Sequence, residues 1–230
     1  MVGSLWLAPI LADVAPFSSV DWLSRSKDGV TIVNKTERVT ISQNQAFQDG
    51  LAQISSSMVG VKAYAREKSG LKLAREGNGL ILTSDGLVAT AGLLVVENGA
   101  MKVLIKGEEF EASVLKNQGP EGVAFLKIER ANLTPVALAD LNAISIGQEI
   151  FLAALDVQAE NLPFFVNRGF VKAKNGSGEI GVNFYPEVPL ATGGAIVNER
   201  GETVGIALVN SVKEVTLIEA DKIRQLLSGS

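Results

Sequence analysis

After residue 57 the chain repeats one pattern: short runs of alternating apolar and polar residues, separated by residues that favour turns. Such runs, rich in Val, Ile, Leu and Phe, are typical of β-strands that bury one face. In two of the intervening segments, Ser84–Gly86 and Glu199–Gly201, a glycine stands where a tight hairpin requires a positive φ angle. The pattern therefore predicts an all-β protein.

Two segments depart from this pattern and predict helices. Residues 43–54 place four apolar side chains at helical spacing, so we expect a short amphipathic helix there, weakened by Gly50 and capped by Ser42. Residues 220–227, near the end of the chain, also have apolar side chains on one helical face. The apolar residues are Ala46, Phe47, Leu51 and Ile54 in the first helix, and Ile223, Leu226 and Leu227 in the second.

The strand pattern divides near Asn132 and Pro135, in a segment rich in loop-forming residues. Two sets of short strands predict two packed β-barrels, although strand periodicity alone fits a β-sandwich as well. We expect an N-terminal β-barrel in residues 43–133 and a C-terminal β-barrel with the C-terminal helix in residues 134–230. Residues 13–42 are polar and mixed, which is typical of an extended lead-in segment, so we expect residues 1–42 to form an N-terminal arm.

The N-terminal arm contains one short apolar stretch, Leu5–Ala12, which includes Trp6 and Pro9. It is shorter than the roughly 20 residues that span a bilayer. The stretch is either the stub of a trimmed membrane anchor or an element that packs on the body of the protein. Residues 1–4 and 228–230 have the composition of cloning remnants and are left out of the fold prediction.

Composition removes most kinds of catalytic site. The 230 residues include no histidine and no cysteine, which excludes imidazole bases, thiolate nucleophiles, disulfides and the usual zinc ligands. A formal net charge of -4 provides no basic field for phosphates, so we expect no nucleic-acid partner. The sequence has neither a calcium-binding loop nor a phosphate-binding Gly-Lys loop, so we predict no metal ion and no cofactor.

Three segments carry a likeness to a known family. They are GNGLILTSDGLVATAGLLV (residues 77–95), FEASVLKNQGPEGVAFLKIE (residues 110–129) and PLATGGAIVNERGETVGIAL (residues 189–208). In this order and spacing they resemble the HtrA (DegP-like) branch of the trypsin-like, chymotrypsin-fold serine proteases, over approximately residues 43–227. The resemblance implies two packed six-stranded antiparallel β-barrels with a short N-terminal helix and a C-terminal helix.

Under this resemblance, the positions that carry the chemistry hold other residues. Leu93 stands where the family has its catalytic histidine, Gly122 where it has the aspartate, and Thr192 where it has the serine. Leu190 takes the place of the oxyanion-hole glycine. Because a triad needs a base and a residue that orients the base, the resemblance implies a degenerate, catalytically inactive member. We expect Leu93 to pack in the core, Gly122 to lie in a turn and Thr192 to be structural.

The resulting prediction is a pseudoprotease that binds a peptide or protein partner in the old substrate cleft. An extended partner chain would add to an edge strand formed by Ala207, Leu208 and Val209. Gly193 and Gly194 are further candidates for contact with the partner, although the turn that holds them gives a steric reason for glycine at both positions.

Two alternatives stay open. The first is a structural or assembly component that uses its outer surface or the N-terminal arm, with Leu93 and Leu190 plugging the cleft. The second and weaker one is a residual hydrolase that uses Thr192, with a lysine such as Lys172 or Lys174 as base. The resemblance also implies a bacterial protein of the cell envelope, in the periplasm or on the outer face of the membrane. It leaves the oligomeric state, the partner and membrane anchoring of the full-length protein open.

Overall fold

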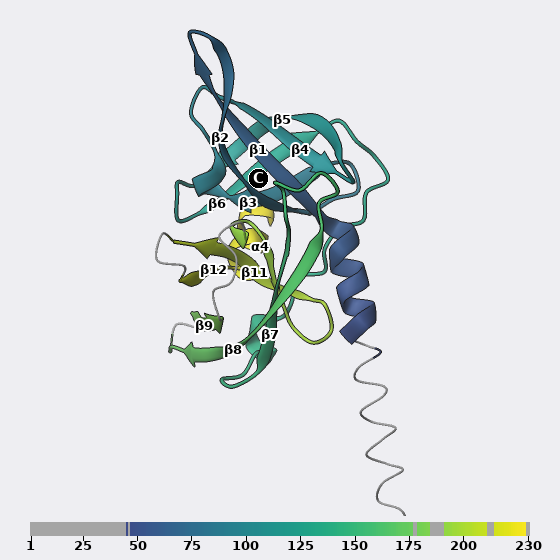
Figure 1. Cartoon of the computed structure of the whole chain (residues 1–230). Coiled ribbons are helices and arrows are strands. Elements are labelled where there is room, and N and C mark those ends of the chain that lie inside the picture. Colours follow the sequence, from purple (N-terminus) through teal and green to yellow (C-terminus); the bar gives the residue numbers. More distant parts are fainter. Residues whose placement is uncertain (1–44, 46, 177–178, 185–190, 211–213, 229–230) are drawn as a thin grey trace, which may run out of the picture. The chain divides into compact units, whose positions relative to one another are not determined.

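The computed structural model describes residues 45, 47–176, 179–184, 191–210 and 214–228 (Figure 1). The chain separates into two units, Met1–Gln45 and Ala46–Ser230, and all the elements below belong to the second unit. The predicted arm, the stretch Leu5–Ala12 and the cap at Ser42 lie outside the described residues. The division of the chain after residues 42 and 133 therefore stays a prediction.

The first six strands form a closed antiparallel barrel in the order β1-β2-β3-β6-β5-β4. The β2–β3 hairpin turns at Gly86, whose φ of 101° confirms the glycine turn predicted there. Beyond the barrel, the outer ends of β1 and β2 project as an exposed ribbon (Figure 1). The strands are β1 (Met58–Glu67), β2 (Gly70–Ile81), β3 (Leu87–Ala91), β4 (Ala100–Ile105), β5 (Glu108–Asn117) and β6 (Val123–Ile128).

The remaining strands form a six-stranded antiparallel sheet in the order β12-β11-β10-β7-β8-β9. This sheet curls until its two end strands approach each other, and the main-chain N–H of Ile180 on β9 donates to Oε1 of Glu219 on β12 at 2.7 Å. The strands are β7 (Glu149–Leu155), β8 (Phe164–Lys174), β9 (Ile180–Phe184), β10 (Ala195–Val197), β11 (Thr203–Val209) and β12 (Val215–Glu219). One closed and one nearly closed six-stranded barrel confirm the two predicted antiparallel β-barrels.

The first predicted helix covers residues 47–57 and lies against the C-terminal barrel. Its apolar face is anchored by Ile54, which is fully buried, and by Phe47, whose ring centroid lies 4.2 Å from that of Phe151. Gly50 contributes close contact rather than helix propensity, because a Cβ atom there would lie 2.8 Å from the carbonyl carbon of Arg200. The glycine that weakens the helix is thus also the residue that lets it reach the β10–β11 turn.

The second predicted helix, α4 (Ala220–Ser228), ends the described chain. Ile223 is buried, whereas Leu227 is 37% exposed, so the apolar face is narrower than the sequence predicts. The guanidinium of Arg224 fixes the helix by donating to the carbonyl oxygens of Leu138 at 2.9 Å and Ala139 at 2.7 Å. None of the described helices is long and apolar enough to cross a membrane.

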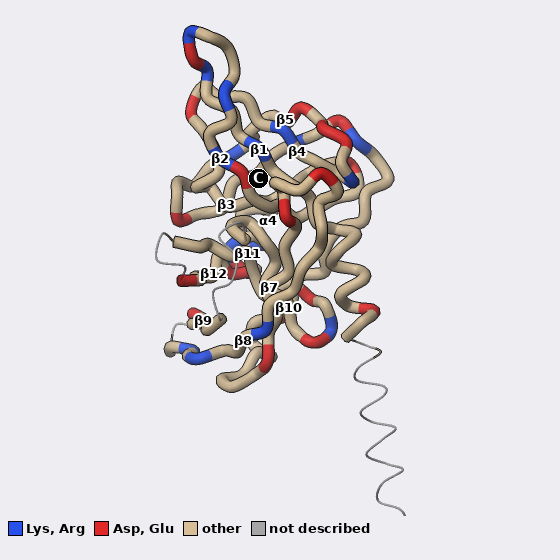
Figure 2. Tube along the Cα trace, viewed as in Figure 1, with Lys and Arg blue, Asp and Glu red and all other residues tan. Residues whose placement is uncertain are grey.

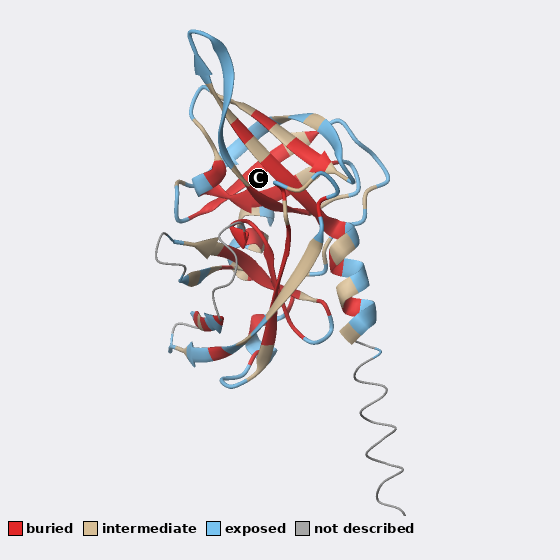
Figure 3. Cartoon of the chain, in the orientation of Figure 1, coloured by how far each residue is buried: buried red, intermediate tan, exposed pale blue. Residues whose placement is uncertain are grey.

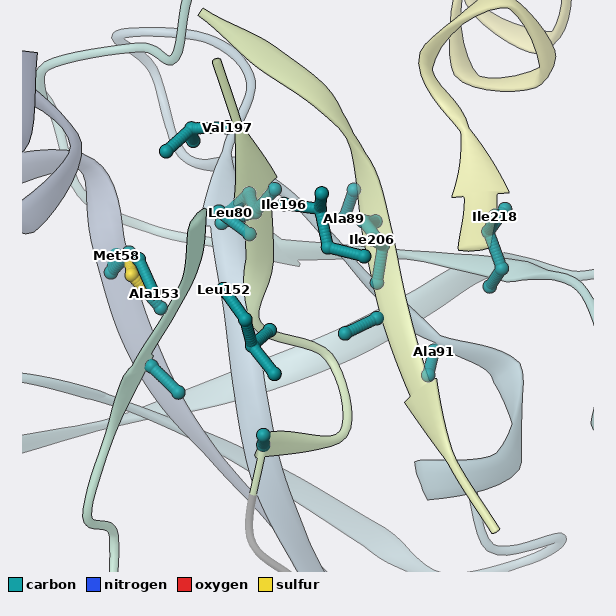
Figure 4. Close-up of a cluster of buried hydrophobic side chains, with 14 of the residues drawn as sticks. Met58, Leu80, Ala89, Ala91, Leu152, Ala153, Ile196, Val197, Ile206 and Ile218 are labelled. Atoms are coloured by element: carbon teal, nitrogen blue, oxygen red, sulfur yellow. The ribbon is translucent and has the colours of Figure 1, made fainter. Parts of the chain in front are cut away.

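The buried residues of both barrels, red in Figure 3, belong to one hydrophobic core. At its centre, Leu80 of β2 and Ala89 of β3 lie close to Ile196 of β10 and Ile206 of β11 (Figure 4). All four residues have 0% exposure. Burial of apolar surface from both sides therefore fixes the barrels against each other, which in turn fixes the residues at their junction.

Candidate functional site at the barrel junction

The position of the family's histidine lies on a single 3-10 turn, η2 (Gly92–Leu94), directly after β3. Leu93 is 37% exposed there, while Leu94 is 4% exposed and packs beside Gly77. The expectation that Leu93 fills the core is therefore wrong. Adjacent side chains of a tight turn point in different directions, and Leu94 is the one that points inward.

A side chain from the β1–β2 ribbon holds this turn from outside. The guanidinium of Arg75 on β2 donates hydrogen bonds to the carbonyl oxygens of Leu93 and Val95, the latter at 2.9 Å. These two carbonyl groups flank the end of η2 and have few partners within so short a helix. Arg75 therefore fixes the backbone of the turn in the place where a catalytic base would stand.

The position of the family's aspartate lies next to the same turn. Gly122 is buried, and its carbonyl oxygen accepts the N–H of Gly92 at 2.8 Å. Its own N–H donates to the carbonyl oxygen of Gly119 at 3.0 Å, which confirms the predicted turn. The neighbouring carboxylate, Glu121, is exposed, so no acidic side chain occupies this position.

The position of the family's serine is filled by a threonine with main-chain partners. Thr192 is 6% exposed, and its Oγ1 accepts the N–H of Val209 at 3.2 Å and lies 3.5 Å from the carbonyl oxygen of Val209, to which it can donate. Its carbonyl oxygen accepts the N–H of Asn78 at 2.8 Å. The side chain therefore behaves as an extension of the sheet, since it pairs with both main-chain groups of one β11 residue.

The chain brings the three positions to one junction. A Cβ atom on Gly77 would lie 2.6 Å from the carbonyl oxygen of Thr192 and 2.7 Å from Cδ1 of Leu94, so both flank Gly77. Because Leu94 belongs to η2, Thr192 lies beside this 3-10 turn. The same turn is hydrogen-bonded to Gly122 through the N–H of Gly92. The spatial relation of the positions follows the resemblance, while their side chains carry no ionisable group.

The two lysines considered as bases have other surroundings. Nζ of Lys174 donates to the carbonyl oxygens of Leu141 at 2.9 Å and Ile144 at 3.0 Å. Lys172 lines a cavity of about 620 Å³ that also borders Glu179 on the β8–β9 connection. Neither lysine is found at Thr192, because Lys174 is bound to Leu141 and Ile144 and the cavity that Lys172 lines does not include Thr192.

Gly193 and Gly194 form the turn that links Thr192 to β10. Gly193 has a φ of 85°, and a Cβ atom there would lie 1.9 Å from the carbonyl oxygen of Asn78. Its N–H donates to the carbonyl oxygen of Ala207 at 2.8 Å, and the N–H of Ala207 donates to the carbonyl oxygen of Gly194 at 2.8 Å. The close approach of the two barrels therefore accounts for glycine at position 193.

The segment expected to receive a partner strand is not a sheet edge. β11 lies between β10 and β12, and Ala207, Leu208 and Val209 lie opposite Leu217, Thr216 and Val215 on β12. On the other side, Ala207 pairs with the glycine turn and Val209 pairs with Thr192. The expectation of an open edge is thus corrected, because segments distant in sequence occupy both sides. Leu190 lies outside the described residues.

One residue at the junction was missed by the sequence analysis. Asn78 is fully buried, and its side chain binds the main chain of Leu155 on β7, with Leu155 N–H to Oδ1 at 2.7 Å and Nδ2 to the Leu155 carbonyl oxygen at 3.3 Å. Its carbonyl oxygen also accepts the hydroxyl of Thr90 at 2.5 Å. A polar residue between two glycines, directly before the buried apolar end of β2, was the available signal, and buried polar groups of this kind need partners.

The ionisable groups whose pKa is shifted lie away from these three positions, elsewhere in the described part of the chain. A hydrogen bond from Thr83 lowers the pKa of Asp85 in the β2–β3 turn, and burial raises the pKa of Tyr64 on β1. A hydrogen bond to Glu109 raises the pKa of Lys102 on the outer face of β4. The described residues also contain no group of three acidic side chains placed to hold a metal ion. The barrel junction therefore has no charged group among the described positions that match the triad.

Comparison with known proteins follows the same segments. Residues 69–206 match the family of the trypsin-like peptidase domain. The Danio rerio protein named "Serine protease HTRA1A" is 26% identical over 198 residues, which cover 79% of this chain and 40% of that protein. The Buchnera aphidicola "Probable periplasmic serine endoprotease DegP-like" is 26% identical over 223 residues, or 89% of this chain and 45% of that protein.

A third relative, "Serine endoprotease DegS" of Haemophilus influenzae, is 23% identical over 193 residues, which cover 77% of this chain and 56% of that protein. The chain thus spans about half of the length of the curated relatives it matches, and less than half of the first two. The similarity therefore covers only part of each of these proteins.

Proposed function

The chain belongs to the trypsin-like peptidase family, in its HtrA-like branch, and from this premise we propose that it is a member without hydrolytic activity that acts by binding other proteins. The observation that carries the proposal is the hydroxyl of Thr192, which is buried and lies between the main-chain N–H and C=O of Val209. A nucleophile must instead face a substrate and pass its proton to a base.

The neighbouring positions support this proposal. Leu93 and Gly122 provide neither a base nor a carboxylate, and the sequence contains no histidine that could take over from elsewhere. In a working triad the base takes the proton of the nucleophile and then returns it to the leaving group. The side chains at positions 93, 122 and 192 provide no base and no carboxylate that could perform either transfer.

A fluorophosphonate probe tests the proposal directly, since it forms a stable adduct with an activated hydroxyl. We expect intact-mass analysis of the protein to show no adduct after prolonged incubation, equally for the native chain and for Thr192→Ala. An adduct that maps to Thr192 and disappears in Thr192→Ala would overturn the proposal. A trypsin sample treated in parallel shows that the probe is reactive.

Two surfaces compete as the place of binding. In the old cleft, the exposed side chain of Leu93 could contact a partner. The outer surface is favoured because Ala207 and Val209 are already paired, so β11 offers a partner no free strand edge in the cleft. Leu93→Arg would place a charge in the cleft, and Leu227→Arg is a matched control because both leucines are 37% exposed. A binding partner lost only with Leu93→Arg assigns the cleft; a partner retained by both variants assigns the outer surface.

We also propose that the protein works outside the cytoplasm, in a bacterial cell envelope. The support is the likeness to HtrA-type proteins, one of which is named a probable periplasmic endoprotease. Fractionation of the source cells tests this proposal. We expect the protein in the envelope fraction, and recovery with cytoplasmic marker enzymes would contradict it.

A further inference from the structure

The N-terminal barrel has a stretch of strand edge without a strand partner. The pairing of β4 with β5 ends where Met101 lies opposite Ala112, whereas β5 continues to Asn117. Over residues 113–117 its register partners are residues of β6, on the other side, with an irregularity between Val114 and Lys116 that leaves Leu115 outside the register. Within the described residues, the β4 side of this stretch is therefore unpaired. Its side chains are exposed, including Val114 at 41% and Leu115 at 60%.

A cavity of about 730 Å³ runs along this edge. Its near wall is β5 with the start of the next turn, and its far wall is the segment that leads from η2 into β4, including Val95 and Val96. That segment turns away from β5 because the N–H of Gly99 donates to the carbonyl oxygen of Val96 at 3.2 Å and Asn98 has a φ of 55°. The local turn thus opens a groove at the place where the β4–β5 ladder stops.

The backbone of β5 presents hydrogen-bonding groups to this groove. The N–H of Gln118 donates to the carbonyl oxygen of Val123 at 3.1 Å, so Gln118 faces β6. Main-chain groups alternate in direction along a strand, which turns those of Asn117 away from β6 and toward the groove. Exposed strand edges of this kind are templates for another extended chain. Five residues span about 16 Å at roughly 3.3 Å per residue, enough to bind a short peptide as an added strand.

Charges of both signs border the groove, including Lys116 on the same stretch of β5. Glu97 on the far wall is exposed, and Glu111 on β5 has its carboxylate 3.7 Å from Nζ of Lys102. Arg66 lies at the end formed by the β1–β2 ribbon. Charged residues of both signs follow β4 and β5 in Figure 2. A partner that passes Glu97 is favoured by a basic side chain, and the exposed Val114, which lines the groove, favours an apolar side chain beside it.

We propose that the groove beside residues 113–117 of β5 binds an extended peptide segment as an additional β-strand. The segment carries apolar residues at alternate positions and a lysine or arginine opposite Glu97. This binding surface is separate from the old substrate cleft, and it does not depend on whether Thr192 can hydrolyse a peptide. It goes beyond the proposed function by assigning the place and the chemistry of the partner.

The test uses the fluorescein-labelled peptide Thr-Val-Lys-Val-Thr and the native chain. Two further peptides carry N-methyl groups, one at the odd and one at the even positions. Because only one set of N–H groups can face β5, we expect one N-methylated peptide to bind at least about tenfold more weakly than the parent and the other to bind nearly as well. Fluorescence anisotropy measures the three affinities, and backbone NMR shifts locate the site.

Glu97→Lys should weaken binding of the parent peptide by about threefold, while the control Glu160→Lys, at another exposed glutamate, should leave it unchanged. NMR shifts at residues 95–99 and 113–117 would support the proposal. Absence of binding, equal affinity of the two N-methylated peptides, or shifts centred on residues 207–209 would overturn it. Self-association of the chain that Glu97→Lys abolishes would also overturn it, since the occupant would then be a second copy.

Discussion

Replacing Asn78 by alanine tests whether a buried amide joins the two barrels. The side chain accepts the N–H of Leu155 at 2.7 Å and donates to its carbonyl oxygen at 3.3 Å, across the junction from β2 to β7. Alanine removes both hydrogen bonds, and the main-chain groups of Leu155 stay buried without these partners. Each lost bond costs about 1 kcal/mol, and the unsatisfied groups add to this cost, so we expect a loss of about 2–4 kcal/mol in the free energy of unfolding.

Urea denaturation followed by circular dichroism measures this loss. For a domain of this size the melting temperature should fall by roughly 5–15 °C. Asn183→Ala is the matched control, because Asn183 also lies on a strand, β9, but is exposed. It should change stability by less than about 0.5 kcal/mol. If Asn78→Ala were no more destabilising than Asn183→Ala, the amide would not join the barrels, and the account of the junction would be refuted.

Three further predictions follow from single contacts. Gly193→Ala should destabilise the fold by more than about 3 kcal/mol in urea denaturation, because its φ of 85° and the carbonyl oxygen of Asn78, 1.9 Å from the added Cβ, both oppose a side chain. Gly50→Ala should loosen the helix of residues 47–57 from the β10–β11 turn and speed its amide hydrogen exchange, since the added Cβ would lie 2.8 Å from backbone atoms. Thr83→Val should raise the pKa of Asp85, because the hydrogen bond from the Thr83 hydroxyl is the main cause of its lowered pKa. An NMR titration of the carboxylate measures this change.

The sign of the Asp85 effect fixes the pH range in which it matters. Its pKa is lower in the folded than in the unfolded chain, so its contribution to stability is present above the unfolded pKa and disappears as the pH falls through the folded pKa. Thr83→Val should reduce this loss of stability at acidic pH. An unaltered titration of Asp85 would contradict the role given to the Thr83 hydroxyl. For the glycine variants, Gly176→Ala is the control, because a Cβ atom there meets no atom within 4 Å.

The fold could be predicted because its signal is local and repeated. Alternation along each strand and the glycine turns at Gly86 and Gly201, with φ angles of 101° and 75°, are properties of short segments. The helix of residues 47–57 could likewise be predicted from the helical spacing of its apolar side chains. The sequence showed that Gly50 weakens this helix but not why glycine is needed there, since the turn that it contacts lies about 150 residues further along the chain.

The candidate site could be located from the sequence, but its contacts could not. Which of Leu93 and Leu94 points inward depends on the geometry of one 3-10 turn, and apolar character is the same for both. The pairing of Val209 with Thr192 joins residues 17 positions apart that no periodic pattern connects. Asn78 escaped notice because its partner, Leu155, lies 77 residues away in the other barrel.

The proposal that the trypsin-like barrels of this chain do not hydrolyse peptide bonds can be tested directly. The most direct measurement is the release of amino groups from unfolded casein over many hours, for the purified native chain and for Thr192→Ala. We predict that both samples match buffer alone, because the Thr192 hydroxyl is paired with Val209 and no histidine exists in the chain to act as its base. Sustained cleavage by the native chain that is lost in Thr192→Ala would contradict it.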